Sequence, residues 1–77
     1  MAVAGATMPA QHIRKRNGRI YIAHSENRPV SVLVDDPEAA EALLLSTGDV
    51  WIPARMRSAL ERRMKRDILP GLAQGDA

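Results

Sequence analysis

Few side chains in this sequence could perform catalysis. The chain has two histidines, His12 and His24, and no cysteine. A Ser–His–Asp arrangement could be assembled from His24, Ser25 and Asp35, but Ser25 lacks the glycine-flanked sequence that exposes a nucleophilic serine. His12 and His24 lie near the outer ends of two predicted strands, yet two histidines without a third ligand make a weak zinc site at best. We therefore expect no enzyme, no metal and no cofactor.

Two adjacent carboxylates could also contribute to a metal site, but the start of a helix explains them better. Asp35 and Asp36 directly precede Pro37, which fits the first position of a helix. Asp36 can then accept hydrogen bonds from the free N–H groups of the first turn. The sequence predicts a helix from this point to about Ser46, ended by Gly48 in a left-handed conformation.

Arginine and lysine are the remaining source of chemistry, and they are unevenly distributed. The formal charge of the chain is +2, but residues 1–28 carry a balance of +4, residues 29–50 one of −5 and residues 51–77 one of +3. Clustered guanidinium groups of this kind neutralise phosphates or bind an acidic protein surface. The elements that position these groups therefore decide what the chain can bind.

A β-hairpin positions the first basic cluster. Asn17-Gly18 favours the type I′ turn of a two-residue loop, which would pair Arg16 with Arg19 and Ile13 with Ile22. Because side chains alternate across a strand, this register separates two faces. The apolar face would hold Ile13, Lys15, Ile20 and Ile22. The basic face would hold His12, Arg14, Arg16, Arg19, Tyr21 and Ala23.

A helix positions the second basic cluster. From Pro53 the apolar residues recur every four positions, as expected for one buried helix face. The apolar residues of this stripe are Met56, Leu60, Met64 and Ile68. The basic residues on the opposite side of the same helix are Arg55, Arg62 and Arg66, flanked by Arg63 and Lys65. The pairs Glu61–Lys65 and Arg63–Asp67 have the spacing that supports an exposed helix.

The remaining segments complete an α+β domain: a small, mainly antiparallel three- or four-stranded sheet with two helices packed on one face. Ser25–Pro29 is interpreted as a turn and Val30–Val34 as a third strand. Val50–Ile52 is either a short fourth strand or a linker. Trp51 is a core residue, a dimer contact or an interface hot spot, and the sequence favours the first two. The expected order is β-β-β-α-(β)-α within residues 11–69, with flexible tails at 1–10 and 70–77.

Composition narrows the setting. No apolar run approaches the length of a membrane span, which takes about 20 residues. The absence of cysteine favours the cytoplasm or another reducing compartment. The small domain also makes a homodimer an open alternative, because domains of this size bury little apolar surface alone.

These observations favour a small binding protein that acts through a basic surface on a protein partner with an acidic surface, or on a nucleoprotein complex. A phage-type inhibitor or accessory factor of a nucleic-acid-handling complex would fit this profile. The alternative is a regulator that binds nucleic acid directly through the basic hairpin. The predicted partner-binding residues are Arg14, Arg16, Arg19 and Tyr21 on the hairpin, with Arg55, Arg62 and Arg66 as a second candidate surface.

Overall fold

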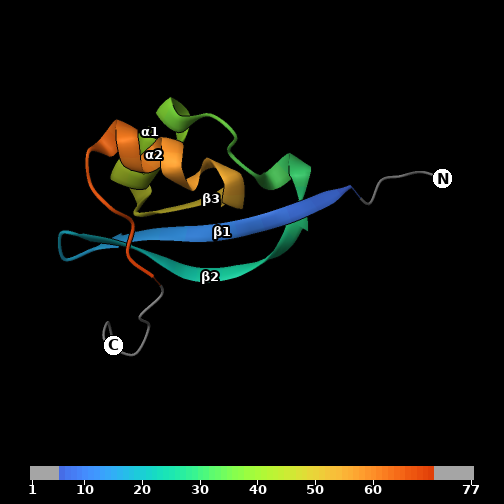
Figure 1. Cartoon of the computed structure of the whole chain (residues 1–77), viewed down its shortest axis with the longest axis horizontal. Coiled ribbons are helices and arrows are strands. Elements are labelled where there is room, and N and C mark those ends of the chain that lie inside the picture. The colour runs from blue at the N-terminus through green and yellow to red at the C-terminus, as the bar shows by residue number, and fades with distance from the viewer. Residues whose placement is uncertain (1–5, 71–77) are drawn as a thin grey trace.

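In the computed structural model, which describes residues 6–70, one antiparallel sheet is covered on one side by two helices (Figure 1). The strands lie in the order β2-β1-β3, so β1 is central and both neighbours run antiparallel to it. The α+β class is confirmed. The elements in this range are β1 (Thr7–Arg16), β2 (Arg19–Pro29), the 3-10 helix η2 (Val30–Val32), α1 (Pro37–Thr47), β3 (Asp49–Pro53), the 3-10 helix η3 (Ala54–Met56) and α2 (Arg57–Met64).

The hairpin turn and its register are confirmed. Asn17 and Gly18 have φ angles of 53° and 77°, which fall in the left-handed region that this turn requires. Arg16 pairs with Arg19, and Ile13 pairs with Ile22. The strand begins earlier than expected, since β1 starts at Thr7, inside the segment predicted as a tail. Residues 1–5 and 71–77 of the predicted tails lie outside the described residues.

The alternation of β2 shifts once, at Ala23. Ile13 pairs with Ile22 but His12 pairs with His24, so Ala23 is an extra residue and not a member of the basic face. Such a bulge moves every later side chain of the strand to the opposite face. The turn predicted at Ser25–Pro29 is wrong, because residues 7–11 of β1 supply a pairing partner and the strand continues to Pro29.

The third strand predicted at Val30–Val34 is also wrong. Val30–Val32 form a 3-10 helix, and Val30 and Val32 are 47% and 51% exposed. The free edge of β1 pairs instead with β3, whose residues Val50 and Ile52 are buried. Val50–Ile52 is therefore a strand, and the observed order is β-β-α-β-α.

Helix α1 begins and ends at the predicted signals. The Asp36 carboxylate accepts a hydrogen bond of 2.9 Å from the Ala39 N–H, and Pro37 occupies the first turn. Gly48 adopts φ = 86° after Thr47, and its N–H donates to the Leu44 carbonyl at 2.8 Å. The cap interpretation of Asp36 is confirmed.

Helix α2 is shorter than the predicted helix. It spans Arg57–Met64, is preceded by η3 and ends where Lys65 adopts a left-handed conformation with φ = 59°. The apolar stripe still faces the sheet, since Met56, Leu60 and Ile68 are buried and Met64 packs against the core. The core cluster lies between the helices and the sheet and contains Ile13, Ile20, Ile22, Ala40, Leu44, Val50, Ile52, Met56, Leu60 and Ile68.

Candidate functional site: the outer sheet face

The side of the sheet that faces away from the helices, here the outer sheet face, carries most of the predicted hairpin residues. The strand pairings place on it His12, Arg14 and Arg16 of β1, Arg19, Tyr21, His24, Glu26 and Arg28 of β2, and Asp49 and Trp51 of β3. This face contains charges of both signs, because β3 contributes Asp49 and the second half of β2 contributes Glu26.

Tyr21 does not contribute exposed surface to this face. It is 6% exposed, so the exposure predicted for it is wrong. The segment after α2 returns to the edge of β2 at this point: Leu69 accepts from the Ile22 N–H and donates to the Ile20 carbonyl, both at 2.9 Å. The sequence pattern of the hairpin could not reveal this pairing, because its partner lies 48 residues away in the chain.

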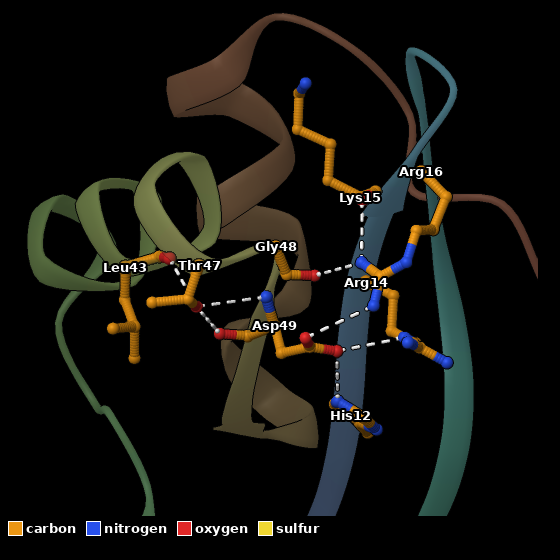
Figure 2. Close-up of polar contacts among 8 residues, drawn as sticks. All are labelled: His12, Arg14, Lys15, Arg16, Leu43, Thr47, Gly48 and Asp49. Atoms are coloured by element: carbon orange, nitrogen blue, oxygen red, sulfur yellow. Dashed lines mark hydrogen bonds and ion pairs between the residues drawn. The ribbon is translucent and has the colours of Figure 1, made fainter.

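Asp49 is the centre of the polar contacts on this face (Figure 2). Its Oδ1 atom lies 2.9 Å from Nε2 of His12 and 2.9 Å from Nε of Arg14. Its Oδ2 atom accepts a longer hydrogen bond of 3.4 Å from Nη2 of Arg16. One carboxylate thus connects three basic side chains that alternate along β1, so the two arginines are only partly neutralised.

The junction between α1 and β3 holds Asp49 in place. The Asp49 N–H donates to the Thr47 hydroxyl at 3.2 Å, and that hydroxyl lies 2.9 Å from the Leu43 carbonyl oxygen. The Gly48 carbonyl accepts from the Lys15 N–H at 2.9 Å and from Nη1 of Arg16 at 3.2 Å (Figure 2). A Cβ atom at position 48 would lie 2.8 Å from Nη1 of Arg16, so glycine is needed for this approach as well as for its φ.

These neighbours lower the pKa of the Asp49 carboxyl. Burial would raise the pKa, but the hydrogen bond with His12 and the positive charges of Arg14 and Arg16 outweigh it. The net result is a pKa below the ordinary value of 3.8. Asp49 therefore stays ionised at neutral pH and holds the arginines in fixed positions.

Trp51 lies next to this group, on the outer sheet face and outside the core cluster. Its indole stacks on the His12 ring, with 4.9 Å between ring centroids and an interplanar angle of 11°. The Cζ atom of Arg28 lies 3.9 Å from the indole centroid, a cation–π distance. The interpretation of Trp51 as a core residue is wrong, because β alternation points Val50 and Ile52 inward and Trp51 outward.

Arg28 is held at Trp51 by its own neighbours. Its Nη2 atom lies 2.6 Å from Oε2 of Glu26, and Oε1 of Glu26 lies 3.4 Å from Nε2 of His24. His24 also meets the indole edge-on, with 6.2 Å between ring centroids. His12 and His24 lie on one face because the bulge at Ala23 moves His24 to the side of His12, whereas the predicted register placed them on opposite faces. Both belong to an aromatic and ionic cluster around Trp51.

The second predicted surface, on the helix layer, does not form one stripe. Arg55 lies in η3 and pairs with Asp35, and Arg66 lies beyond the end of α2. The Glu61–Lys65 and Arg63–Asp67 pairs are not among the ion pairs of residues 6–70; Arg63 pairs with Glu41 of α1 at 2.6 Å instead. Helical spacing is lost after Met64, and this explains the difference. Arg62 and Arg66 are exposed and form no ion pair within the described residues.

Residues 6–70 contain neither a metal-binding cluster nor a membrane-spanning helix. In this part of the chain, no group of three or more His, Cys, Asp or Glu side chains could hold a metal ion. None of the helices described is long and apolar enough to cross a membrane. Within the described residues, the outer sheet face is where polar and aromatic side-chain contacts are most concentrated.

The sequence pattern did not identify five residues of this face: His24, Glu26, Arg28, Asp49 and Trp51. The alternation Asp49-Val50-Trp51-Ile52 was the available signal, since a strand with Val50 and Ile52 inward must place Asp49 and Trp51 together. Arg28 carried no such signal, because the bulge at Ala23 decides its face. Comparison of the chain with protein-family models, with curated proteins and with solved structures finds no match.

Proposed function

We propose that this chain is a non-enzymatic binding protein whose outer sheet face binds a protein partner with an acidic surface. The observation that carries this proposal is the placement of Trp51, partly exposed between His12 and Arg28 on an arginine-rich face. Tryptophan and arginine are the residue types most enriched at the energetic centres of protein interfaces. A partner of this kind fits an inhibitor or accessory factor of a nucleic-acid-handling complex.

The charge of the face supports an acidic partner. Arg14, Arg16, Arg19 and Arg28 outnumber the acids Asp49 and Glu26 by two. Arg19 is exposed at the turn and has no ion pair within the described residues, so it is free to meet a carboxylate. Charge complementarity of this kind raises the association rate and selects the orientation of the partner.

The order of the face supports binding as well. Asp49 holds Arg14 and Arg16, and Glu26 holds Arg28, so these long side chains are already restricted before a partner arrives. Ordering a flexible side chain at an interface costs about 0.5–1.5 kcal/mol, and this cost is reduced where the side chain is held in advance. The face is thus suited to a partner with a matching shape.

The alternative, a hairpin that binds nucleic acid directly, is less well supported on this face. Asp49 partly neutralises Arg14 and Arg16, the two arginines that such a hairpin would use. His12 and Arg28 already occupy stacking positions on Trp51, so a nucleobase would have to displace one of them. A stretch of free cations would suit a phosphate backbone better than this paired arrangement.

The test compares variants as bait in a nuclease-treated lysate of the source cells. We expect one protein to be retained by the wild type and by Leu45→Ala, an exposed change on α1 away from this face. Trp51→Ala should weaken binding of the purified partner at least about 30-fold, and Arg19→Glu about tenfold. Trp51 is the only tryptophan, so its fluorescence should change when the partner is added.

Circular dichroism of each variant checks that it remains folded. The proposal is overturned if a partner binds Trp51→Ala and Arg19→Glu as tightly as the wild type. A second outcome also overturns it: a protein is retained from untreated lysate but not from nuclease-treated lysate, and duplex DNA binds the wild type but neither variant. The face would then bind nucleic acid.

A further inference from the structure

The end of α2 presents a second, different basic surface on the helix side of the sheet. Ser58 and Arg62 lie one helical turn apart on the exposed side of α2, while Leu60 faces the core. Lys65 and Arg66 follow directly where the helix ends. These side chains line a shallow open hollow together with Glu61 and Asp67. We call the four residues Ser58, Arg62, Lys65 and Arg66 the α2-end patch.

The backbone that carries this patch is fixed at both ends. The Lys65 and Arg66 N–H groups donate to the Glu61 carbonyl, the latter at 3.2 Å. The Ile68 N–H donates to Oε2 of Glu61 at 2.9 Å, and Ile68 is buried in the core. The chain then passes the end of the sheet and reaches the edge of β2 (Figure 1). Lys65 and Arg66 therefore project from a backbone segment that hydrogen bonds and the burial of Ile68 hold in place.

The three cations of the patch are free to bind an anion. Arg62, Lys65 and Arg66 are exposed, and none forms an ion pair with another residue of the range 6–70. Glu61 lies beside them, but one of its carboxylate oxygens is committed to the Ile68 N–H. Asp67 is the remaining exposed acid of the hollow. The cations thus outnumber the acids, and they lack the internal partners that Arg14 and Arg16 have.

We propose that the α2-end patch binds the phosphate backbone of duplex nucleic acid. Among residues 6–70, no apolar or aromatic side chain lines the hollow, whereas the centre of a protein interface is normally built from such residues. This described lining also offers no ring on which an unpaired base could stack. What remains is a group of cations and a hydroxyl, the groups that contact phosphodiester oxygens without reading sequence. This site is independent of the outer sheet face, which lies on the other side of the sheet.

The experiment measures binding to a fluorescein-labelled random duplex DNA of about 20 base pairs by anisotropy across a salt series. Three phosphate contacts predict a slope of about −2.7 in a plot of log affinity against log salt concentration, because each contact contributes about −0.9. The double change Arg62→Ala with Arg66→Ala should remove about two of these contacts and reduce the slope to about −0.9.

The chain offers a matched control in the same layer. Arg55→Ala with Arg63→Ala also removes two arginines and the same charge, but these arginines are already paired with Asp35 and Glu41. This control should keep a slope within about 0.5 of the wild-type value, as one phosphate contact is worth about 0.9. Asp67→Asn should increase the affinity a few-fold, because it removes the free acid of the hollow.

Three outcomes would overturn the proposal. One is that wild-type protein does not bind the duplex at low salt, and another is that both double variants lose affinity equally, which would indicate a nonspecific effect of net charge. The third is that poly-glutamate competes as well as unlabelled duplex, which would make the surface one for acidic protein. Trp51→Ala separates this proposal from the proposed function: it should leave DNA affinity unchanged while weakening binding of the protein partner at least about 30-fold.

Discussion

On the outer sheet face, Asp49 lies between Arg14 and Arg16 and Glu26 holds Arg28, whereas at the end of α2 the cations Arg62 and Arg66 have no ion pair within residues 6–70. Both regions contain several basic residues in the sequence. They differ because β3 and the second half of β2 bring acids that pair with the arginines of one region, whereas Glu61 and Asp67 at the other form no ion pair within residues 6–70. The difference teaches that the number of basic residues in a run does not give the number free to bind an anion, because the fold pairs some of them with acids.

The two regions also differ in what surrounds their charges. The outer sheet face has Trp51 near its centre, with His12 stacked on it, whereas no aromatic side chain of the described residues lines the hollow of the α2-end patch. An aromatic centre suits a partner that buries apolar surface, and a purely polar hollow suits a ligand that is held by charge. The same residue type, arginine, therefore serves two kinds of binding in our proposals.

The largest expected effect concerns the turn on which the outer sheet face depends. Replacing Asn17 and Gly18 with valine should cost about 2–4 kcal/mol, because each β-branched side chain would have to adopt a positive φ. Urea unfolding measures this cost, followed by Trp51 fluorescence for the outer sheet face and by far-UV circular dichroism for the helices. Asn17→Gly is the control and should remain within about 1 kcal/mol of the wild type.

If the Val-Val variant has the wild-type midpoint, the hairpin does not depend on this turn. Coincident transitions of the two probes are expected for a domain of this size, since one core joins the helices to the sheet. Separate transitions would show that the outer sheet face and the α2 layer are two units of stability, and the comparison between them would extend to folding.

The next effect concerns Asp49. Asp49→Asn should cost about 1 kcal/mol at neutral pH, a modest value because the side chain is 38% exposed and water screens its charge. The folded-state pKa of Asp49 lies below the ordinary value, so its contribution is present above pH 3.8. It is lost as the pH falls through the lowered folded-state pKa.

Thermal unfolding of wild type and Asp49→Asn between pH 7 and pH 2 provides the measurement. The difference in stability should shrink as Asp49 of the wild type becomes protonated. Asp35→Asn is the matched control, since Asp35 contacts one arginine and is more exposed. A difference that persists at the lowest pH would show that Asp49 acts through its shape and not through its charge.

The smallest expected effect is the difference in stability between arginine variants of the two regions. Arg14→Ala and Arg16→Ala should each cost about 1 kcal/mol, because each leaves the shared carboxylate with one cation fewer. Arg62→Ala and Arg66→Ala should each remain within about 0.5 kcal/mol of the wild type, as expected for surface positions without partners. Equal losses at all four positions would remove the distinction between paired and free arginines.

Much of the local structure was predictable from short stretches of sequence. Asn17-Gly18 specifies the turn because few other residue pairs adopt two positive φ angles, and Asp36-Pro37 with Gly48 delimits α1 through its free backbone groups. The apolar period from Met56 to Ile68 predicted burial correctly, although α2 ends at Met64. Each of these features depends on residues within a few positions of one another.

The candidate site was less predictable, because its parts come from separate strands. Arg14, Arg16 and Arg19 were recognised from the hairpin register, but the acid that holds two of them lies in β3. Val30–Val34 has the alternating apolar pattern of a strand, but Val30–Val32 form a 3-10 helix. The edge of β1 pairs with β3 instead, which contains Val50 and Ile52. Competition for one sheet edge cannot be read from the competing segments separately.

By itself, the sequence determined the α+β class, the hairpin register and the caps of α1, because backbone conformation and side-chain alternation are local properties. Only the tertiary structure decided which arginines are paired, that Tyr21 is buried and that Trp51 faces outward beside Arg28. The physical reason is that these outcomes depend on contacts between distant segments, such as Leu69 with β2 and Asp49 with β1. The residue type sets the charge of a side chain, but the fold decides whether that charge is paired with another residue.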